Sequence, residues 1–187
     1  TLDHCVVRYG GYYQHANIVC SGASPTITHT EIAYSSDDGL KLRDGAHPVL
    51  ANNTIIRNAG WPVYIEHFTA IPDFRNNTIT QNAHDGIYLN GGDVPTGQKV
   101  TLNLPAVPYV VGNNNIKVRA GATLNIPAGV ILKFTEDRYL QVDGGGTLSA
   151  KGTVDDRIVF TAYTDDHYGG DTNSDGPASI PVGDYWN

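Results

Sequence analysis

A short acidic segment near the end of the chain carries the residue spacing best suited to chemistry. Asp171-Thr172-Asn173-Ser174-Asp175-Gly176 places three oxygen-bearing side chains at alternate positions and ends in a glycine. Such side chains can converge on one hard cation, and the glycine permits the sharp turn that this requires. The surrounding segment, from Thr164 to Asp184, contains five aspartates and neither lysine nor arginine. We therefore expect a bound Ca²⁺ to order this loop, with an acidic, solvated turn as the alternative.

The spacing Asp-x-Asn-x-Asp-Gly resembles the first half of an EF-hand calcium loop. The resemblance implies Asp171, Asn173, Asp175 and the carbonyl oxygen of Pro177 as ligands. Outside the resemblance, Asp184 is expected to complete the shell. Asp165 and Asp166 are alternatives to Asp184. The resemblance ends at Val182, which stands where the EF-hand family has a bidentate glutamate, and no flanking helix is indicated. A site without that glutamate is expected to suit millimolar extracellular calcium.

A second group of reactive side chains is spread over residues 37–90. The group consists of Asp37, Asp38, Lys41, Arg43, Tyr64, Glu66, His84, Asp85 and Tyr88. Tyrosines, carboxylates and amides on one surface suit the binding of a polysaccharide, and paired carboxylates of this kind can cleave a glycosidic bond. The alternative is that these are ordinary outward-facing polar side chains. Which explanation holds depends on the elements that carry them.

A repeat of 23 to 25 residues positions the second group. Four similar segments begin at Leu2, Ile27, Leu50 and Phe74, and in each of them apolar residues alternate with polar ones. This alternation is typical of a strand with one buried face. A fixed period of this length indicates coils that stack on one another and share a continuous core. The sequence therefore predicts an all-β solenoid of parallel strands.

The alignment of the repeats predicts which side chains stack. The inward columns are Leu2-Ile27-Leu50-Phe74, Val7-Ile32-Ile55-Ile79 and Cys20-Leu42-Ile65-Leu89. The outward columns are Lys41-Tyr64-Tyr88 and Arg43-Glu66-Asn90, with Asp37, Asp38, His84 and Asp85 just before these strands. Asparagines recur at two corners, as Asn53 with Asn77 and as Asn58 with Asn82. Their amides are expected to bond from one coil to the next.

The phrase Pro-x-apolar-x-x-Asn-x-Ile-x-x-Asn, followed by Gly-apolar-x-apolar, extends over residues 2–90. With this phrase the chain resembles the right-handed parallel β-helix proteins, a group that includes pectate lyase-like folds and many secreted bacterial surface proteins. The resemblance implies a right-handed parallel β-helix with coils of about 22–25 residues and a secreted or cell-surface location. It leaves the activity open, because one solenoid hosts many functions.

The sequence divides into four segments. Residues 1–92 resemble the later coils of a β-helix, and residues 93–113 indicate an irregular connection with one or two strands. Residues 114–163 resemble the opening coils of a β-helix, and residues 164–187 form the acidic loop. Because this order is inverted, we expect a segment of a longer chain or one unit of a tandem array. Strand edges exposed at its two ends favour end-to-end self-association.

Composition narrows the possible functions. The net charge is −7 with only 12 lysines and arginines, so no basic surface for nucleic acid is indicated. No apolar run is long enough to cross a bilayer. We expect an extracellular β-helix segment that serves as a structural or carbohydrate-binding module of a larger protein and is stabilised by calcium. The alternative is a polysaccharide lyase or glycoside hydrolase of the β-helix class, for which the sequence assigns no catalytic residue.

Overall fold

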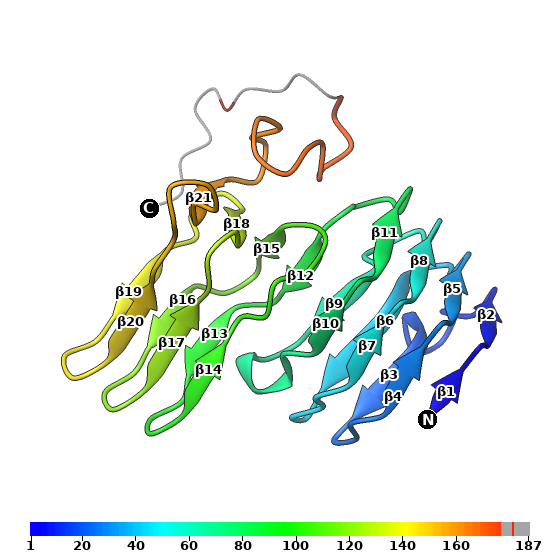
Figure 1. The fold of residues 1–187 in the computed structure, drawn as a ribbon, viewed down its shortest axis with the longest axis horizontal. Helices are drawn as coiled ribbons and strands as arrows, with labels where there is room; N and C mark the ends of the chain where they lie inside the picture. Colours follow the sequence, from blue (N-terminus) through cyan, green and yellow to red (C-terminus); the bar gives the residue numbers. More distant parts are fainter. Residues whose placement is uncertain (177–180, 182–187) are drawn as a thin grey trace.

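The computed structural model describes residues 1–176 and residue 181. In these residues the only helical element is the short 3-10 helix η1 (Phe68–Ala70), and all sheets are parallel. The strands wind into turns that stack along one axis, from β1 and β2 at one end to β19, β20 and β21 at the other (Figure 1). The predicted all-β solenoid is therefore confirmed.

Five sheets line the solenoid, and we name them sheets A to E. Sheet A consists of β1 (Leu2–Asp3), β4 (Thr26–Thr28), β7 (Val49–Ala51) and β10 (Asp73–Arg75). Sheet B consists of β2 (Val6–Arg8), β5 (Glu31–Ala33), β8 (Thr54–Ile56) and β11 (Thr78–Thr80). Sheet C consists of β3 (Ala16–Ser21), β6 (Asp38–Arg43), β9 (Val63–Ile65), β12 (Ile87–Leu89), β15 (Tyr109–Val111), β18 (Ile131–Phe134) and β21 (Val159–Ala162). Sheet D consists of β13 (Gly92–Val94), β16 (Ile116–Val118) and β19 (Leu140–Val142), and sheet E of β14 (Lys99–Thr101), β17 (Thr123–Ile126) and β20 (Thr147–Ala150).

The three predicted inward columns are present in the strand register. Ile27 pairs with Leu2 and Leu50, and Leu50 pairs with Phe74 in turn. The other two columns have the same one-to-one register between successive turns. Most of these side chains are buried, and Ile27, Leu50 and Ile55 have no exposed surface. The core is thus continuous from turn to turn, as a solenoid requires.

The corner asparagines form two buried ladders. Asn53 donates from its side-chain amide to the Ile27 carbonyl oxygen at 2.8 Å, while Asn77 Oδ1 accepts the Asn53 backbone N–H at 3.0 Å. Asn58 and Asn82 repeat this arrangement at the second corner, where Asn82 Oδ1 accepts the Asn58 N–H at 3.1 Å. Each ladder therefore satisfies buried backbone groups at a turn where the strands separate.

Residues 92–111 form the fifth turn of the solenoid. We expected an irregular connection with one or two strands in 93–113, but three strands, β13, β14 and β15, are present. Pro95, Pro105 and Pro108 all lie between strands, where the missing N–H costs no ladder bond. β15 pairs with β12 on one side and β18 on the other, so sheet C joins the two halves of the chain.

Sheets A and B end at β10 and β11, whereas sheets D and E begin at β13 and β14. Only sheet C crosses this break within the described residues. Its outer face is partly covered by the segment 163–176, which follows β21 and folds back toward earlier turns (orange in Figure 1). This arrangement brings the acidic segment next to the outward columns predicted from the repeats.

Candidate functional site

Outward side chains of sheet C form a row of stacked groups. Lys41, Tyr64 and Tyr88 occupy matching positions on β6, β9 and β12. The Tyr64 and Tyr88 rings stack with centroids 4.8 Å apart, and the Lys41 ammonium lies 5.0 Å from the Tyr64 ring centroid. Neighbouring strands of a sheet are about 4.8 Å apart, so the stacking follows directly from the register. The outward column predicted from the repeats is therefore present.

Trp61 widens this row into an aromatic cluster, which we define as Trp61, Tyr64, His84, Tyr88 and Tyr163. The Trp61 ring stacks on His84 with centroids 4.4 Å apart and contacts Tyr88 at 4.9 Å. Tyr163, which follows β21, lies 6.2 Å from Trp61, and its hydroxyl group lies 3.1 Å from His84 Nδ1. The cluster thus joins side chains from three turns of the solenoid.

Members of the aromatic cluster differ in their access to solvent. Tyr88 is only 8% exposed, whereas Trp61 and Tyr64 are half-buried and present part of their rings. Burial raises the pKa of Tyr88 to about 12 and also raises the pKa of Tyr64, where Asp38 and Glu66 add to the effect. Burial lowers the pKa of His84. The tyrosine rings are therefore uncharged near neutral pH, and the half-buried members of the cluster, Trp61, Tyr64, His84 and Tyr163, are those that a ligand can reach.

A row of polar side chains runs beside the aromatic cluster. Asn90 Oδ1 accepts hydrogen bonds from the Tyr64 hydroxyl group at 3.2 Å and from the Asn113 amide at 2.8 Å. Arg43 lies 3.7 Å from Asp44, measured from Nε to Oδ2, and Glu66 follows Arg43 in the same column. This row offers hydrogen-bond donors and acceptors next to aromatic faces, which is the combination that orients a polar, ring-shaped ligand.

Asp37 and Asp38 lie at the N-terminal end of the row and have different hydrogen-bond partners. Asp37 pairs with His15, with 2.8 Å between Oδ2 and Nδ1, and remains partly exposed. Asp38 is 4% exposed and accepts the Trp61 backbone N–H on Oδ1 at 2.8 Å. Burial, with a smaller effect from Asp37, raises the pKa of Asp38 to about 7. The two carboxyl groups are therefore neighbours that differ in burial.

Asp85 has a local structural role. Its carboxylate accepts backbone N–H groups of Gln81 at 2.8 Å and of Asn82 at 2.9 Å, and it also accepts the Asn82 side-chain amide. These bonds cap the second asparagine ladder at its last rung. Among the nine side chains predicted for the outer surface, Asp85 is thus hydrogen-bonded to the backbone of its own corner, and Asp38 to the backbone of the neighbouring turn. Lys41, Tyr64 and Tyr88 form one row.

The acidic segment brings three carboxylates together. Oxygen atoms of Asp166, Asp171 and Asp175 lie within 4.8 Å of one another. Asp171 accepts the backbone N–H groups of Asp175 at 3.2 Å and of Gly176 at 3.1 Å, and Asn173 donates to Asp175 Oδ2 at 2.7 Å. Among the described residues, the buried Asn173 Oδ1 atom has no hydrogen-bond partner.

The other two ligands that we expected, Pro177 and Asp184, lie outside the described residues. Within the described residues, a lysine side chain from sheet C reaches the acidic segment. Lys133 on β18 has no exposed surface, and its ammonium group donates to the Gly170 carbonyl oxygen at 2.7 Å. Burial lowers the pKa of Lys133, and this is opposed by nearby carboxylates, chiefly Asp166. The acidic segment is therefore docked on a lysine that lies 37 residues earlier in the chain.

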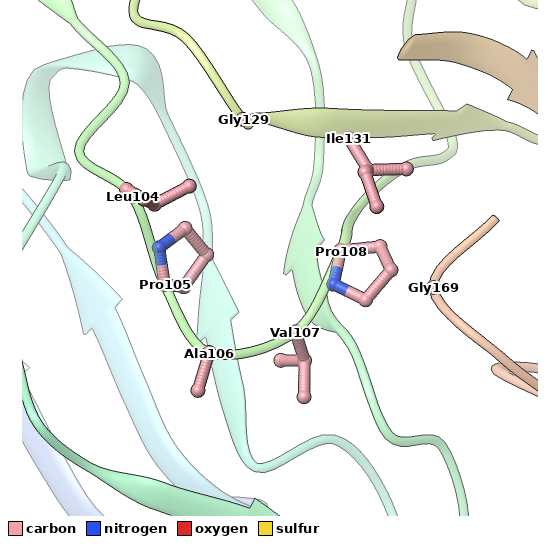
Figure 2. Close-up of a pocket in the computed structure, with 8 residues that line it drawn as sticks. All are labelled: Leu104, Pro105, Ala106, Val107, Pro108, Gly129, Ile131 and Gly169. Carbon is pink, nitrogen blue, oxygen red and sulfur yellow. The ribbon is translucent and has the colours of Figure 1, made fainter. Parts of the chain in front are cut away.

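The cavities in the described part of the chain include a small apolar pocket and a larger, more polar one. Figure 2 shows a small pocket of about 130 Å³ in which Pro108 and Ile131 lie near Gly169. Its lining contains no ionisable side chain: Leu104, Pro105, Ala106, Val107, Pro108, Gly129, Ile131 and Gly169. A larger cavity of about 320 Å³ lies between η1 and β14 of sheet E, and His47 and Lys99 are among its lining residues. Neither cavity brings together the groups needed for catalysis.

The sequence analysis did not predict three residues that belong to this surface: Trp61, Tyr163 and Lys133. Trp61 could have been found, because the repeat alignment places it in the same column as Asp38 and Asp85. Tyr163 and Lys133 meet their partners through the return of segment 163–176, which no local pattern indicates.

Comparison with known protein families agrees with the parallel solenoid fold. Residues 1–122 match the family described as the right handed beta helix region. The chain belongs to this right-handed β-helix family. Residues 92–174 also match the pectate-lyase like beta helix domain, so this β-helix is of the pectate-lyase-like type. No curated protein and no solved structure matches it. No helix in the described part of the β-helix is long and apolar enough to cross a membrane.

Proposed function

We propose that this β-helix is a carbohydrate-binding module of a secreted or cell-surface protein and that the glycan lies along the outer face of sheet C. The observation that carries the proposal is the stack of Lys41, Tyr64 and Tyr88, with Trp61 against Tyr88, beside a row of amides and charges. Sugar rings present an apolar face that packs on an aromatic ring and hydroxyl groups that need polar partners at its edge. Both kinds of partner are adjacent here.

The spacing of the row favours a chain-like ligand. Successive outward side chains are one strand apart, and the accessible rings of Tyr64 and Trp61 belong to the same turn. Lys41 and Arg43 lie among the carboxylates of Asp37, Asp38 and Asp44, so the charge on the row does not distinguish between neutral and acidic polysaccharides.

Affinity electrophoresis against a panel of neutral and acidic polysaccharides tests this proposal. We expect at least one polysaccharide of the panel to retard the β-helix. Absence of retardation by every polysaccharide in the panel contradicts the proposal and leaves a purely structural module.

We also propose that calcium stabilises the acidic segment. The support is the convergence of Asp166, Asp171 and Asp175, together with the buried Asn173 oxygen atom that has no partner among the described residues. Oxygen ligands of this kind suit Ca²⁺. Because Lys133 already supplies one positive charge, calcium binding is expected to be weak.

Hydrolysis of a glycan is the second candidate function. It is favoured by the adjacent carboxyl groups of Asp37 and Asp38, of which Asp38 has a pKa raised to about 7 and so resembles a general acid. It ranks second because Asp38 is 4% exposed and already accepts the Trp61 N–H. Release of reducing sugar that disappears in both Asp37→Asn and Asp38→Asn supports this function, and glycan binding without any release excludes it.

End-to-end self-association is a further proposal. In the described residues, β1, β2 and β3 at one end and β19, β20 and β21 at the other pair on one side only. Unpaired strand edges invite pairing with another copy. Sedimentation velocity over a hundredfold range of concentration is expected to show growth of larger species, and a constant monomer mass contradicts it.

A further inference from the structure

Two histidines and an aspartate converge at the first corner of the solenoid, far in sequence from the acidic segment. Asp3 Oδ2 lies 3.0 Å from His4 Nδ1, and Asp3 Oδ1 lies 3.0 Å from His29 Nδ1. One potential ligand atom from each of the three residues lies within 4.8 Å of the other two. The imidazole rings are stacked, with centroids 4.6 Å apart and planes inclined by 17°. None of these side chains belongs to the aromatic cluster or to its polar row.

The repeat produces this arrangement. His4 and His29 occupy the same corner of successive turns, since Leu2 pairs with Ile27 and Asp3 with Thr28. Both have left-handed backbone, with φ of 52° and 47°, so the two side chains leave the corner in the same direction. In the next two turns the same position is occupied by Asn52 and Asn76, with φ of 56° and 50°. The first two turns therefore place metal-binding side chains where the later ones carry amides.

We propose that Asp3, His4 and His29 form a binding site for a divalent transition metal of the zinc class. In a tetrahedral zinc site with metal–ligand bonds of 2.0–2.2 Å, donor atoms are about 3.3 Å apart. The two nitrogen–oxygen distances of 3.0 Å are close to this spacing. Two imidazole nitrogens and one carboxylate oxygen suit Zn²⁺, Cu²⁺ or Ni²⁺, whereas Ca²⁺ prefers a shell of oxygen atoms.

Neighbouring groups hold the proposed ligands in place. Thr28 Oγ1 donates to Asp3 Oδ1 at 2.7 Å, and the Asn52 amide lies 3.5 Å from His29 Nε2. When Nδ1 of His29 binds a metal, the neutral imidazole ring carries its proton on Nε2. If the Asn52 amide is rotated, its oxygen atom can accept a hydrogen bond from this Nε2–H group.

The site is open to solvent and spans two turns. The side chains of Asp3, His4 and His29 are 50%, 73% and 48% exposed, so an ion can enter and water can occupy a fourth position. Asp3 and His4 belong to the first turn and His29 to the second. A bound metal would therefore link β1 to β4 and restrain the end of the solenoid.

Titration of the tag-free protein with Zn²⁺ by calorimetry, and with Co²⁺ by visible absorption, tests the site. We expect one ion per chain and a Co²⁺ spectrum typical of nitrogen and oxygen ligands. His29→Ala and Asp3→Asn should each weaken Zn²⁺ binding by more than about tenfold. His15→Ala is the matched control, because His15 also pairs with an aspartate but has no second histidine beside it.

Hydrogen exchange provides a second readout. Zn²⁺ is expected to slow exchange of the backbone amides in β1 and β4 of the wild-type protein but not of His29→Ala. The proposal is overturned if the wild type binds no Zn²⁺, or if His29→Ala binds it as tightly as His15→Ala does. Circular dichroism without metal confirms that each variant is folded, which is expected because all three side chains lie on the surface.

Discussion

The ammonium group of Lys133 donates a hydrogen bond to the carbonyl oxygen of Gly170 at 2.7 Å. Through this bond a buried lysine on the outer face of sheet C holds a segment rich in aspartate. A buried charge is tolerated only when it is paired and hydrogen-bonded, and here the neighbouring carboxylates and the carbonyl oxygen supply both conditions. The acidic segment is consequently part of the folded surface next to the aromatic cluster.

Replacement of this lysine should loosen the segment. The Lys133→Met substitution removes the buried ammonium group beside the carboxylates, and the methionine side chain has a volume similar to that of lysine. We expect the free energy of unfolding to fall by about 1–3 kcal/mol and exchange of amides in 163–176 to accelerate. Urea unfolding and hydrogen exchange measure the two effects. Lys117→Met, which removes a lysine on sheet D that contacts Tyr139, is the control and should change little.

Calcium should stabilise the wild-type protein slightly and the Lys133→Met variant more strongly. The metal and the lysine both neutralise Asp166, Asp171 and Asp175, so loss of one increases the effect of the other. Thermal melts in millimolar calcium and in chelator provide the test. Asp171→Ala should abolish the difference between the two conditions. An equal melting temperature with and without calcium in both proteins would show that the loop needs no metal.

Asp38 should make the protein less stable as the pH rises. Its pKa is raised from 3.8 to about 7 on folding, so between these values the folded state binds more protons than the unfolded state. The contribution of Asp38 to stability is therefore present below about pH 4 and is lost as the pH rises through 7. The full effect is at most about 4 kcal/mol.

Asp38→Asn keeps an acceptor for the Trp61 N–H without the buried charge. It should be more stable than the wild type at pH 8, and the gap should close on acidification to pH 4. Chemical unfolding across this pH range measures the gap, with the exposed Glu136→Gln as control. A gap that stays constant with pH would mean that Asp38 does not titrate in this range.

Much of the fold follows from local sequence patterns. The columns beginning at Leu2, Val7 and Cys20 are found in the register because each strand repeats an alternation whose inward face must be buried. Asn53 and Asn77 were recognisable because a corner repeats the same unsatisfied backbone groups in each turn. The stack of Lys41, Tyr64 and Tyr88 follows from the same register.

Other features depend on contacts that no repeat encodes. Tyr88 was expected to face solvent, but Trp61 lies against it and it is 8% exposed. Asp38 was expected on the outer surface, yet it turns toward the backbone of the next turn. The return of segment 163–176 joins Tyr163 to His84, which lies 79 residues earlier. Such long-range contacts depend on the path of a loop, and the spacing of residues alone does not predict that path.

The central claim, that Trp61 and Tyr64 bind a glycan, is tested most directly by affinity electrophoresis of two single variants. Trp61→Ala removes the ring that contacts His84 and Tyr88, while Tyr139→Ala removes a half-buried ring beside Lys117, next to sheet D. Both variants are first checked for the wild-type circular dichroism spectrum. We predict that Trp61→Ala loses at least tenfold in affinity for the polysaccharide that retards the wild type, whereas Tyr139→Ala retains it. Equal retardation of both variants would contradict the assignment of the binding surface to the outer face of sheet C.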